Sequence, residues 1–282
     1  MIFGIVILFL AVLGCAAYLV AIKPRTRGKP EYAGHVGDVL YAHRGLHDNE
    51  TDAPENTMRA FEKAVEAGYG IELDVQLTKD KVPVIFHDFT LQRMCNVAGK
   101  VIDYTYDELQ EFAICGTDQR IPKFEDFLNM VAGRVPLVVE LKVEYKDLSV
   151  CPLADALLRN YSGKYCIESF NPLAVKWYRD HNPEVVRGQL ADAFMKGTEY
   201  RGALYFALHH LLFNFMTKPD FVAYNCLHPD TLSRKICRKL YKNTAVAWTV
   251  KSQKQLDDLQ DKFDVFIFDS FVPVAKSSTN VI

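Results

Sequence analysis

This sequence has no large excess of positive or negative charge. Lys and Arg together number 33 and Asp and Glu number 35, so the formal net charge at pH 7 is −2. No basic stripe with interleaved aromatic residues occurs along the chain. Proteins that bind nucleic acids through their phosphates need such a basic surface. The composition therefore excludes nucleic acid as an expected partner.

Paired cysteines are missing as well. The seven cysteines are scattered through the chain, and none belongs to a C-x-x-C pair. Such a set predicts neither a disulfide framework nor a zinc site built on cysteine. Cys166 and Cys226 lie inside apolar runs and are expected to be small buried hydrophobic residues.

Charge is absent altogether from residues 2–22, which are dominated by Ile, Leu, Val, Phe and Ala. At about 1.5 Å per residue, a helix of this length spans about 30 Å, enough for the core of a bilayer. Lys23, Arg25, Arg27 and Lys29 follow, with no acidic residue among them. Positive charge directly after a span favours a cytoplasmic location for the rest of the chain. We therefore expect a single-pass protein of the cell membrane.

Two alternatives for this segment are weaker. A cleaved signal peptide is disfavoured because no basic residue precedes the apolar run and no A-x-A site follows a short one. Val12-Leu13-Gly14-Cys15 resembles a lipobox, which would instead anchor an exported protein through Cys15. The expected organisation is a transmembrane anchor over residues 1–22, a polar linker over 23–36 and one folded domain over 37–282.

Strand-like and helix-like segments alternate after the linker, which is typical of a parallel α/β sheet. Strands are expected at 39–43, 71–75, 82–87, 137–142, 165–170, 185–190, 221–226, 245–250 and 265–269. Helices are expected after Pro54 and at 124–132, 153–160, 172–181, 230–241 and 253–259. Residues 88–123 have a mixed character and are expected to form a small excursion.

These strands are one more than a TIM (β/α)8 barrel needs. Only the turn at Lys79-Asp80-Lys81 separates 71–78 from 82–87, whereas parallel neighbours need a crossover of about a dozen residues. The two segments therefore form a hairpin, whose second arm returns His87 over the mouth of the barrel. The sequence predicts an α/β fold with a TIM barrel, preceded by a single transmembrane helix.

Residues 201–216 are apolar on nearly all sides, whereas a barrel helix should carry a single apolar stripe. The segment is either a well-buried helix or a surface element that enters the bilayer beside the anchor. His209 and His210 within it are expected to be interfacial rather than catalytic.

Ionisable residues gather at the C-terminal ends of the predicted strands. Glu72 and Asp74 share one face of a strand, with their Cα atoms about 6.5 Å apart. An isolated pair of this kind would more simply be a solvated polar face. Here His43, His87 and Glu140 end other strands, as catalytic residues do at the mouth of a barrel. Carboxylates held so close repel unless a cation lies between them, and Mg²⁺ or Ca²⁺ suits oxygen ligands.

The order of these motifs resembles that of the glycerophosphodiester phosphodiesterase family. The matching motifs are His43-Arg44-Gly45, Pro54-Glu55-Asn56-Thr57, Ile71-Glu72-Leu73-Asp74-Val75, Thr78-Lys79-Asp80, Pro83-Val84-Ile85-Phe86-His87-Asp88 and Val139-Glu140-Leu141-Lys142, with weaker ones at Ser169-Phe170 and Trp248-Thr249-Val250. Together they cover residues 39–270. Each motif alone is weak, whereas their ordered combination is highly specific.

The resemblance implies a TIM barrel that hydrolyses glycerophosphodiesters to sn-glycerol 3-phosphate and an alcohol. It implies a divalent metal, Mg²⁺ or Ca²⁺, held by Glu72, Asp74 and Glu140. It also implies His43 and His87 as the catalytic acid and base. Which histidine is the acid, and whether water or the glycerol 2-hydroxyl attacks, the sequence leaves open.

Five further residues are expected to bind the substrate or to support the metal ligands. Arg44 offers a bidentate fork to phosphate oxygens and Lys142 a compact charge. Trp248 is either core packing or a wall that faces the glycerol. Glu55 is either a helix N-terminal acid or a residue behind the metal ligands, and Asn56 is expected to brace the loop after the first strand.

Two positions depart from the family pattern. Lys81 stands in the hairpin turn where the family usually carries Gly, a change expected to alter the turn without touching the chemistry. The loop at 46–53 is acidic and contains His47. This loop either disfavours anionic head groups or helps to hold the metal, and His47 is expected to be a loop residue near the mouth.

The membrane anchor and the apolar 201–216 segment favour lipid-derived substrates. A lysophospholipase D-like activity on membrane lysophospholipids is therefore the near alternative. Phosphatidylinositol-specific phospholipases share the two-histidine chemistry, but the E-x-D and E-L-K motifs fit them less well. A catalytically silent lipid-binding module is the alternative from a different class, and the intact His43 and His87 argue against it.

Overall fold

The computed structural model describes residues 2–194 and 202–274. Its single sheet consists of β1 (Tyr41–His43), β2 (Gly70–Leu77), β3 (Pro83–Ile85), β4 (Leu137–Leu141), β5 (Tyr165–Ser169), β6 (Val186–Ala191), β7 (Phe221–Asn225), β8 (Thr244–Val250) and β9 (Val265–Phe268). The strand order is β1-β9-β8-β7-β6-β5-β4-β2-β3, and a further pairing of β1 with β2 closes the barrel. The predicted TIM barrel is confirmed, although β1 begins two residues later than expected.

The predicted hairpin is confirmed as well. β3 pairs antiparallel with β2, whereas the other eight strands are parallel neighbours around the barrel. The backbone amide of Phe86 then donates to the carbonyl of Asp74 at 2.9 Å. This bond holds the chain just before His87 against the strand that carries the acidic pair.

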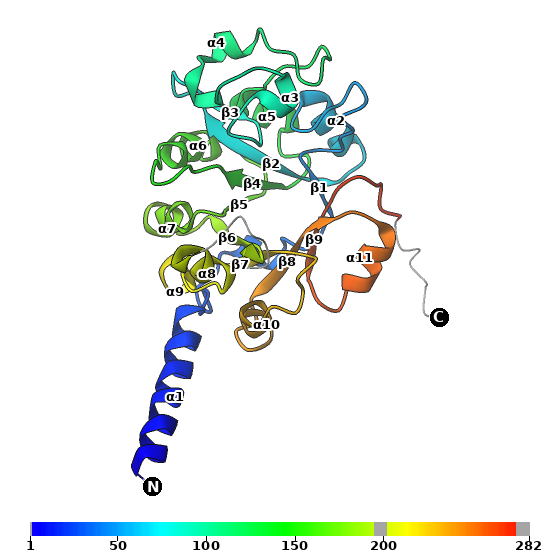
Figure 1. Ribbon diagram of the computed structural model, residues 1–282. Helices are drawn as coiled ribbons and strands as arrows, with labels where there is room; N and C mark the ends of the chain where they lie inside the picture. Colours follow the sequence, from blue (N-terminus) through cyan, green and yellow to red (C-terminus); the bar gives the residue numbers. More distant parts are fainter. Residues whose placement is uncertain (1, 195–201, 275–282) are drawn as a thin grey trace, which may run out of the picture.

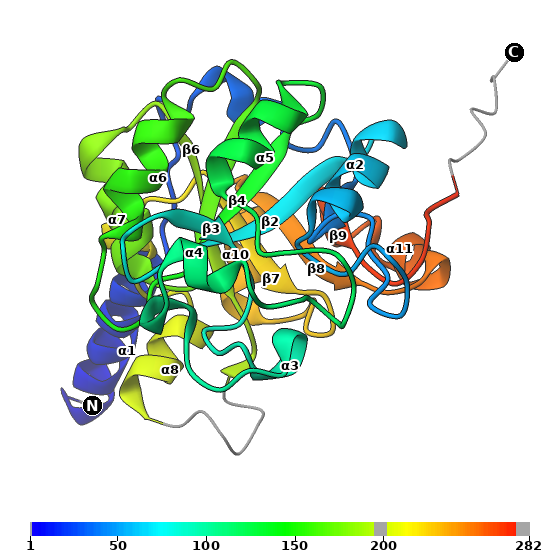
Figure 2. The ribbon, with the colours of Figure 1, turned by 90° about the horizontal axis from the view of Figure 1, so that it is seen from above.

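The excursion after β3 is a small subdomain with its own core. It contains the short helices α3 (Gln92–Cys95) and α4 (Tyr106–Leu109). Its buried residues are Val84, Phe86, Leu91, Met94, Val101, Leu109, Ile114 and Ile121. Seen from above, α4 lies over β3, whereas α3 lies to one side, away from β2 and β3 (Figure 2). The subdomain therefore stands beside the residues that the hairpin carries.

The interior of the barrel is apolar at its base and polar at its mouth. Tyr41, Val138, Cys166, Val246 and Val265 belong to one buried cluster inside the barrel. Two residues further along several of these strands stand polar or ionisable residues, namely His43, Glu140, Glu168 and Trp248. Because side chains two apart share a strand face, the inward face changes from apolar to polar towards the strand ends.

The outer helices are α2 (Met58–Glu66), α5 (Phe124–Val131), α6 (Val150–Leu158), α7 (Pro172–His181), α10 (Leu232–Lys239) and α11 (Gln253–Leu259). They agree with the predicted helices to within a few residues at each end. In α2, Thr57 caps the first turn by accepting from the Ala60 amide. The apolar face of this helix, Ala60, Phe61, Ala64 and Val65, is buried. This helix fixes the loop that follows β1.

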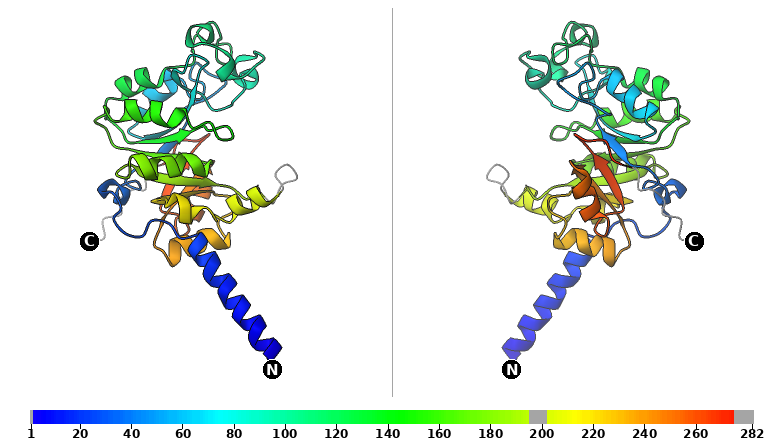
Figure 3. Two further views of the ribbon diagram at one scale, coloured as in Figure 1. Left: turned by 90° about the vertical axis from the view of Figure 1, so that its left-hand side faces the viewer. Right: turned by 90° about the vertical axis from the view of Figure 1, so that its right-hand side faces the viewer.

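The helix α1 (Ile2–Ala21) projects from the barrel, and none of its residues is buried (Figure 1). It is long and apolar enough to cross a membrane, as the sequence predicts. In the side views it leaves one end of the molecule, and the subdomain with α3 and α4 forms the other end (Figure 3). The barrel is therefore joined to the apolar helix α1 at the end of the molecule away from this subdomain.

The segment expected to link the anchor to the barrel is attached to the barrel surface. Ile22 is fully buried, and its carbonyl accepts from Nδ2 of Asn214 at 3.0 Å. Arg25 lies 3.7 Å from the carboxylate of Asp220, and Lys29 donates to the Asp220 carbonyl at 3.2 Å. These contacts fix the direction in which α1 leaves the barrel.

The apolar segment expected at 201–216 is not one helix. Residue 201 lies outside the described residues, and the remainder forms α8 (Ala203–His209) and α9 (Asn214–Thr217). Leu211 separates the two helices with a left-handed φ of 57°. Leu211 and Asn214 are buried, whereas Leu204, Phe206 and Phe215 are about half exposed. Of the two alternatives for this segment, the well-buried helix is therefore wrong, because the chain turns and buries only one side; entry into the bilayer stays a prediction.

Candidate active site

Acidic residues form a continuous arc across three neighbouring strands. The strand register pairs Asp74 of β2 with Glu140 of β4, and Glu140 with Glu168 of β5. On the other side of β2, Glu72 pairs with His43 of β1. One carboxylate oxygen from each of Glu72, Asp74 and Glu140 lies within 4.8 Å of the others. The three predicted metal ligands are thus brought together at one end of the barrel.

Three of these carboxyl groups are destabilised in their charged form. Burial, together with the charges of Asp74 and Glu140, raises the pKa of Glu72 well above its usual range. Burial also raises the pKa of Glu140. The pKa of Glu168 is raised well above its usual range by burial and by Glu140 and Asp74. Each of these groups would gain from a nearby positive charge.

Asp74 is the exception, because cations surround it. Burial alone would raise its pKa, but Lys142, His87 and Arg44 lower it well below the usual range. Lys142 Nζ lies 3.1 Å from Asp74 Oδ1 and donates to Glu140 Oε1 at 2.9 Å. Lys142 therefore serves as an internal counterion for two of the predicted metal ligands.

The loop after β1 has a backbone that few residues tolerate. Gly45 has a φ of +84°, and a Cβ there would lie 2.8 Å from the carbonyl carbon of Ala60. Arg44 and Asn56 also have positive φ angles, of 55° and 58°. The Asn56 amide donates to the Arg44 carbonyl at 2.9 Å, as expected for a residue that braces this loop. Its Nδ2 also donates to Asp74 Oδ2 at 2.9 Å.

Arg44 lies among carboxylates rather than free. Its Nη1 donates to Glu55 Oε1 at 2.7 Å, and its Nε lies 3.5 Å from Asp74 Oδ2. Its backbone amide donates to Glu72 Oε2 at 3.2 Å. Burial would raise the pKa of Glu55, but hydrogen bonds from Arg93 and the charge of Arg44 lower it to about 2. Glu55 is thus a charged residue that holds Arg44 behind the acidic pair.

His43 is oriented by a carboxylate that sequence reasoning missed. Its Nδ1 lies 3.2 Å from Oδ2 of Asp269, directly after β9. Since a carboxylate only accepts, Nδ1 carries the proton and Nε2 keeps its lone pair. Nε2 lies 3.9 Å from Glu72 Oε2. Burial and the charge of Arg44 lower the pKa of His43 to about 4, so the ring is neutral at pH 7.

His87 also has a carboxylate partner. Its Nδ1 lies 2.5 Å from Asp88 Oδ1, and its side chain is 32% exposed, about twice the exposure of His43. Asp88 in turn accepts from Arg93 Nε at 2.6 Å, and Arg93 Nη2 donates to Glu55 Oε1 at 2.7 Å. Arg93 of α3 thereby ties the subdomain to both the His87 and the Arg44 sides of the site.

Trp248 points into the mouth from β8. Its ring packs edge-on against Phe170 with 5.4 Å between the ring centroids. Its buried Nε1 has no hydrogen-bond partner among the described residues. A cavity of about 340 Å³ beside it is also lined by Asn225 and Lys251. Trp248 therefore offers both an apolar face and an unused donor.

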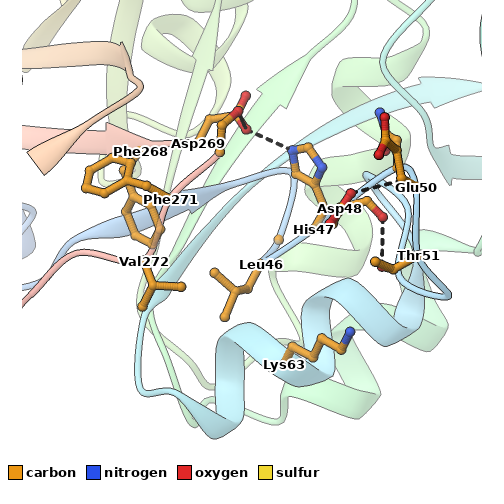
Figure 4. Close-up of a pocket in the computed structure, with 13 residues that line it drawn as sticks. Leu46, His47, Asp48, Glu50, Thr51, Lys63, Phe268, Asp269, Phe271 and Val272 are labelled. Atoms are coloured by element: carbon orange, nitrogen blue, oxygen red, sulfur yellow. Dashed lines mark hydrogen bonds and ion pairs between the residues drawn. The ribbon is translucent and has the colours of Figure 1, made fainter.

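A larger cavity, of about 680 Å³, opens beside the acidic arc rather than over it. It lies between the loop after β1 and the segment after β9 (Figure 4). Its lining includes His47, Asp48, Glu50, Lys63 and Asp269. His47 Nε2 lies 3.2 Å from Asp269 Oδ1, so the cavity reaches the carboxylate that orients His43. The predicted position of His47 near the mouth agrees with this arrangement.

Glu168, Asp269, Asp88 and Arg93 were not predicted as site residues. Glu168 and Asp269 stand near the ends of predicted strands, as the predicted metal ligands do, so the position of each was a usable signal. Asp88 belongs to a matching motif but was read only as a neighbour of His87. Arg93 lies in the excursion, where no pattern in the sequence indicates which way a side chain points.

Comparison with known proteins agrees with this geometry. The family model described as "Glycerophosphoryl diester phosphodiesterase family" matches residues 43–266. The Bacillus subtilis (strain 168) protein YhdW is 30% identical over 240 residues, which cover 78% of this chain and 89% of that protein. A glycerophosphodiester phosphodiesterase of Bacillus altitudinis is 40% identical over 112 residues, 37% of this chain and 44% of that enzyme.

Among solved structures, a phosphodiesterase of Oleispira antarctica, in complex with its product sn-glycerol 3-phosphate, shares the fold. The TM-score is 0.66 at 22% identity, and the match covers 82% of this chain and 92% of that one. Two curated relatives are matched over about half of their length, 58% of one and 44% of the other. The family model covers most of this chain and begins at His43 itself. The chain therefore belongs to the glycerophosphoryl diester phosphodiesterase family.

Proposed function

We propose that this protein hydrolyses glycerophosphodiesters to sn-glycerol 3-phosphate and an alcohol, with one divalent cation and two histidines. The observation that carries the proposal is the convergence of Glu72, Asp74 and Glu140 beside His43 and the strand that leads to His87. Cleavage of a phosphodiester needs a base for the attacking hydroxyl, an acid for the leaving alkoxide and positive charge near the phosphoryl oxygens. In this proposal the two histidines supply the base and the acid, and the three carboxylates hold the cation that supplies the positive charge.

The residues of the arc fit a divalent cation. Glu72, Asp74, Glu140 and Glu168 are at most 7% exposed. Lys142 contacts Asp74 and Glu140, and the Arg44 guanidinium lies near Asp74, whereas Glu72 receives only the backbone amide of Arg44. The buried Oε2 of Glu168 has no hydrogen-bond partner among the described residues. Glu72, Asp74 and Glu140 would hold the ion, and their oxygen ligands suit Mg²⁺ or Ca²⁺. When bound, such an ion polarises the phosphoryl group and lowers the pKa of a bound hydroxyl.

In this proposal His43 is the general base. Its Nδ1 proton is engaged by Asp269, and its Nε2 lone pair faces the acidic arc. Since its pKa is lowered to about 4, the ring is available as a base at neutral pH. The hydroxyl that it deprotonates is either water or the 2-hydroxyl of the glycerol.

His87 is then the general acid. It follows β3, the arm of the hairpin opposite to the strand that carries Glu72 and Asp74. It is more exposed than His43, and Asp88 is a carboxylate partner for its protonated ring. A proton on Nε2 would pass to the leaving alkoxide. Lys142 uses two of its donors on Asp74 and Glu140, which leaves a third for a phosphoryl oxygen of the substrate.

Release of glycerol 3-phosphate from glycerophosphocholine and related diesters tests the proposal. The full chain in detergent is assayed after EDTA treatment and again after Mg²⁺ or Ca²⁺ is restored. We expect activity only with metal, and a loss of more than about a hundredfold in His43→Ala and Glu72→Ala. Binding of diesters without turnover under any metal condition would instead support a silent lipid-binding module.

A second candidate substrate is a membrane lysophospholipid. The exposed side chains of Leu204, Phe206 and Phe215 lie on α8 and α9, and α9 packs where α1 joins the barrel through the bond from Asn214 to Ile22. With α1 in a bilayer, this apolar surface would lie near the lipid headgroups. A lysophospholipase D-like reaction uses the same residues on a diester that still carries an acyl chain.

The barrel is proposed to lie on the cytoplasmic side of the cell membrane. Lys23, Arg25, Arg27 and Lys29 directly follow α1, and short positively charged segments favour the cytoplasm. Protease accessibility in intact cells tests this orientation. Cleavage of the barrel by an external protease would contradict it.

A further inference from the structure

A second cluster of possible metal ligands lies next to the acidic arc. It consists of His43 at the end of β1, His47 in the following loop and Asp269 after β9, and one ligand atom from each lies within 4.8 Å of the others. His43 Nδ1 and His47 Nε2 are each 3.2 Å from an oxygen of Asp269. We propose that His43, His47 and Asp269 form a separate, zinc-class metal site whose occupation inhibits the enzyme.

His47 is a buried imidazole whose contact with Asp269 leaves the hydrogen-bonding capacity of its ring incompletely used. Both of its ring nitrogens are buried, and neither makes a well-oriented hydrogen bond to the described residues. Its Nε2 is close to Asp269 Oδ1 but is not aligned with it as a hydrogen bond requires. Buried polar nitrogens of this kind are rare unless a water or an ion completes them. The ring, with the Asp269 carboxylate beside it, is therefore placed to bind an ion.

The ligand types distinguish this cluster from the acidic arc. Two imidazoles and one carboxylate suit zinc and similar transition metals, whereas Mg²⁺ and Ca²⁺ prefer oxygen alone. At metal–ligand distances of about 2.0–2.1 Å, tetrahedral ligands stand about 3.3 Å apart, and each histidine already lies 3.2 Å from one of the two Asp269 oxygens, His43 from Oδ2 and His47 from Oδ1. A fourth position would remain open to water. The two sites would thus select different metals although they are adjacent, with His43 of one beside Glu72 of the other.

The cavity beside the cluster provides access. It is lined by His47 and Asp269, whose side chains are turned towards each other and touch (Figure 4), and by Asp48 and Glu50 of the acidic loop. Lys63 is the one full cation among the residues that line it. Carboxylates around an opening raise the local concentration of cations. A metal ion can therefore reach the cluster without passing through the acidic arc.

Occupation would remove the base, a consequence that rests on the function proposed for His43. Metal binding at Nδ1 displaces the hydrogen bond to Asp269, and the ring proton moves from Nδ1 to Nε2. The nitrogen that faces Glu72 then donates instead of accepting, so it cannot take a proton from the attacking hydroxyl. The number of protons on the ring does not change.

Calorimetric titration of Zn²⁺ into the full chain, in detergent with saturating Mg²⁺, tests the site directly. We expect one zinc ion to bind the wild type and the affinity to fall at least tenfold in His47→Ala and in the size-matched His47→Gln. His35→Ala is the control, because His35 forms a similar 2.9 Å pair with Asp38 but on the exposed surface. Circular dichroism verifies that each variant is folded.

Turnover gives a second, independent readout. Each variant is compared with its own rate without zinc, and half-inhibition should need at least tenfold more Zn²⁺ in both His47 variants. Equal binding and inhibition in wild type and His47→Ala would overturn the proposal, as would inhibition that excess Mg²⁺ relieves equally in both, which places zinc at Glu72, Asp74 and Glu140. If no diester is cleaved, the function proposed above fails, and the calorimetry still decides whether this site exists.

Discussion

Replacement of Lys142 by Met tests the electrostatic balance of the acidic arc. The Lys142 side chain is 9% exposed and lies 3.1 Å from Asp74 Oδ1 and 2.9 Å from Glu140 Oε1. Burial would lower its pKa, but these two carboxylates raise it above its ordinary value. Met has a similar length and no charge, so the variant leaves buried carboxylates without their counterion.

Removal of one partner from a buried ion pair costs about 3–5 kcal/mol. For a domain of about 150–250 residues, 1 kcal/mol shifts Tm by about 2–4 °C, so Tm should fall by about 6–20 °C in EDTA at pH 7. Thermal unfolding followed by circular dichroism, with the full chain in detergent, measures this shift.

The cost of Lys142→Met should depend on pH. The pKa of Asp74 is depressed, so its paired form stabilises the protein above the unfolded pKa, and this stability is lost as pH falls. The pKa of Glu140 is raised, so that group takes up a proton first on acidification. Because of both effects, the difference in Tm between wild type and Lys142→Met should become smaller as the pH is lowered.

Lys254→Met is the matched control, since Lys254 pairs with Asp258 on the exposed face of α11 (Gln253–Leu259) and is 84% exposed. An exposed pair of this kind contributes little to stability, because solvent screens it. If Lys142→Met lowered the Tm in EDTA no more than Lys254→Met does, the idea that Lys142 is the counterion of the arc would be refuted. Mg²⁺ should restore more stability to Lys142→Met than to wild type.

Three further predictions concern activity. The acid limb of kcat/KM should lie near pH 4, because His43 must be unprotonated and its pKa is lowered to about 4; a limb near about 6.5, the ordinary histidine value, would contradict its role. Asp269→Asn should lower kcat by at least about tenfold with KM little changed, since the hydrogen bond that orients His43 loses its charge; an unchanged kcat would contradict this positioning. Leu204→Ser combined with Phe206→Ser should slow cleavage of lysophospholipid in vesicles but not of soluble glycerophosphocholine; equal effects on both would count against a membrane-facing surface.

The barrel and the meeting of Glu72, Asp74 and Glu140 at one end of it could be predicted, because strand periodicity and strand order place these residues; their role as metal ligands, which the family resemblance implies, stays a prediction. Alternation along β2 (Gly70–Leu77) places Glu72 and Asp74 on one face, and the short turn at 79–81 makes the hairpin unavoidable. Glu140 follows from the same reasoning on the next barrel strand. These residues lie near one another because adjacent strands are in register.

Partners that depend on closure of the barrel could not be predicted. Asp269 reaches His43 because β9 (Val265–Phe268) pairs with β1 (Tyr41–His43), more than two hundred residues away in the chain. Arg93 reaches Glu55 through the packing of an irregular subdomain, which has no periodicity to interpret. The break at Leu211 is a backbone feature that hydropathy does not record. The predicted roles of Arg44, Lys142 and Trp248 towards substrate stay predictions.

Diffraction from crystals soaked in Mn²⁺, measured at the manganese absorption edge, tests the central claim most directly. We predict one anomalous peak about 2.0–2.6 Å from oxygens of Glu72, Asp74 and Glu140, and its absence in the Glu72→Gln variant. A peak elsewhere, or no peak while the enzyme hydrolyses glycerophosphodiesters at full rate, would contradict a cation held by these three carboxylates.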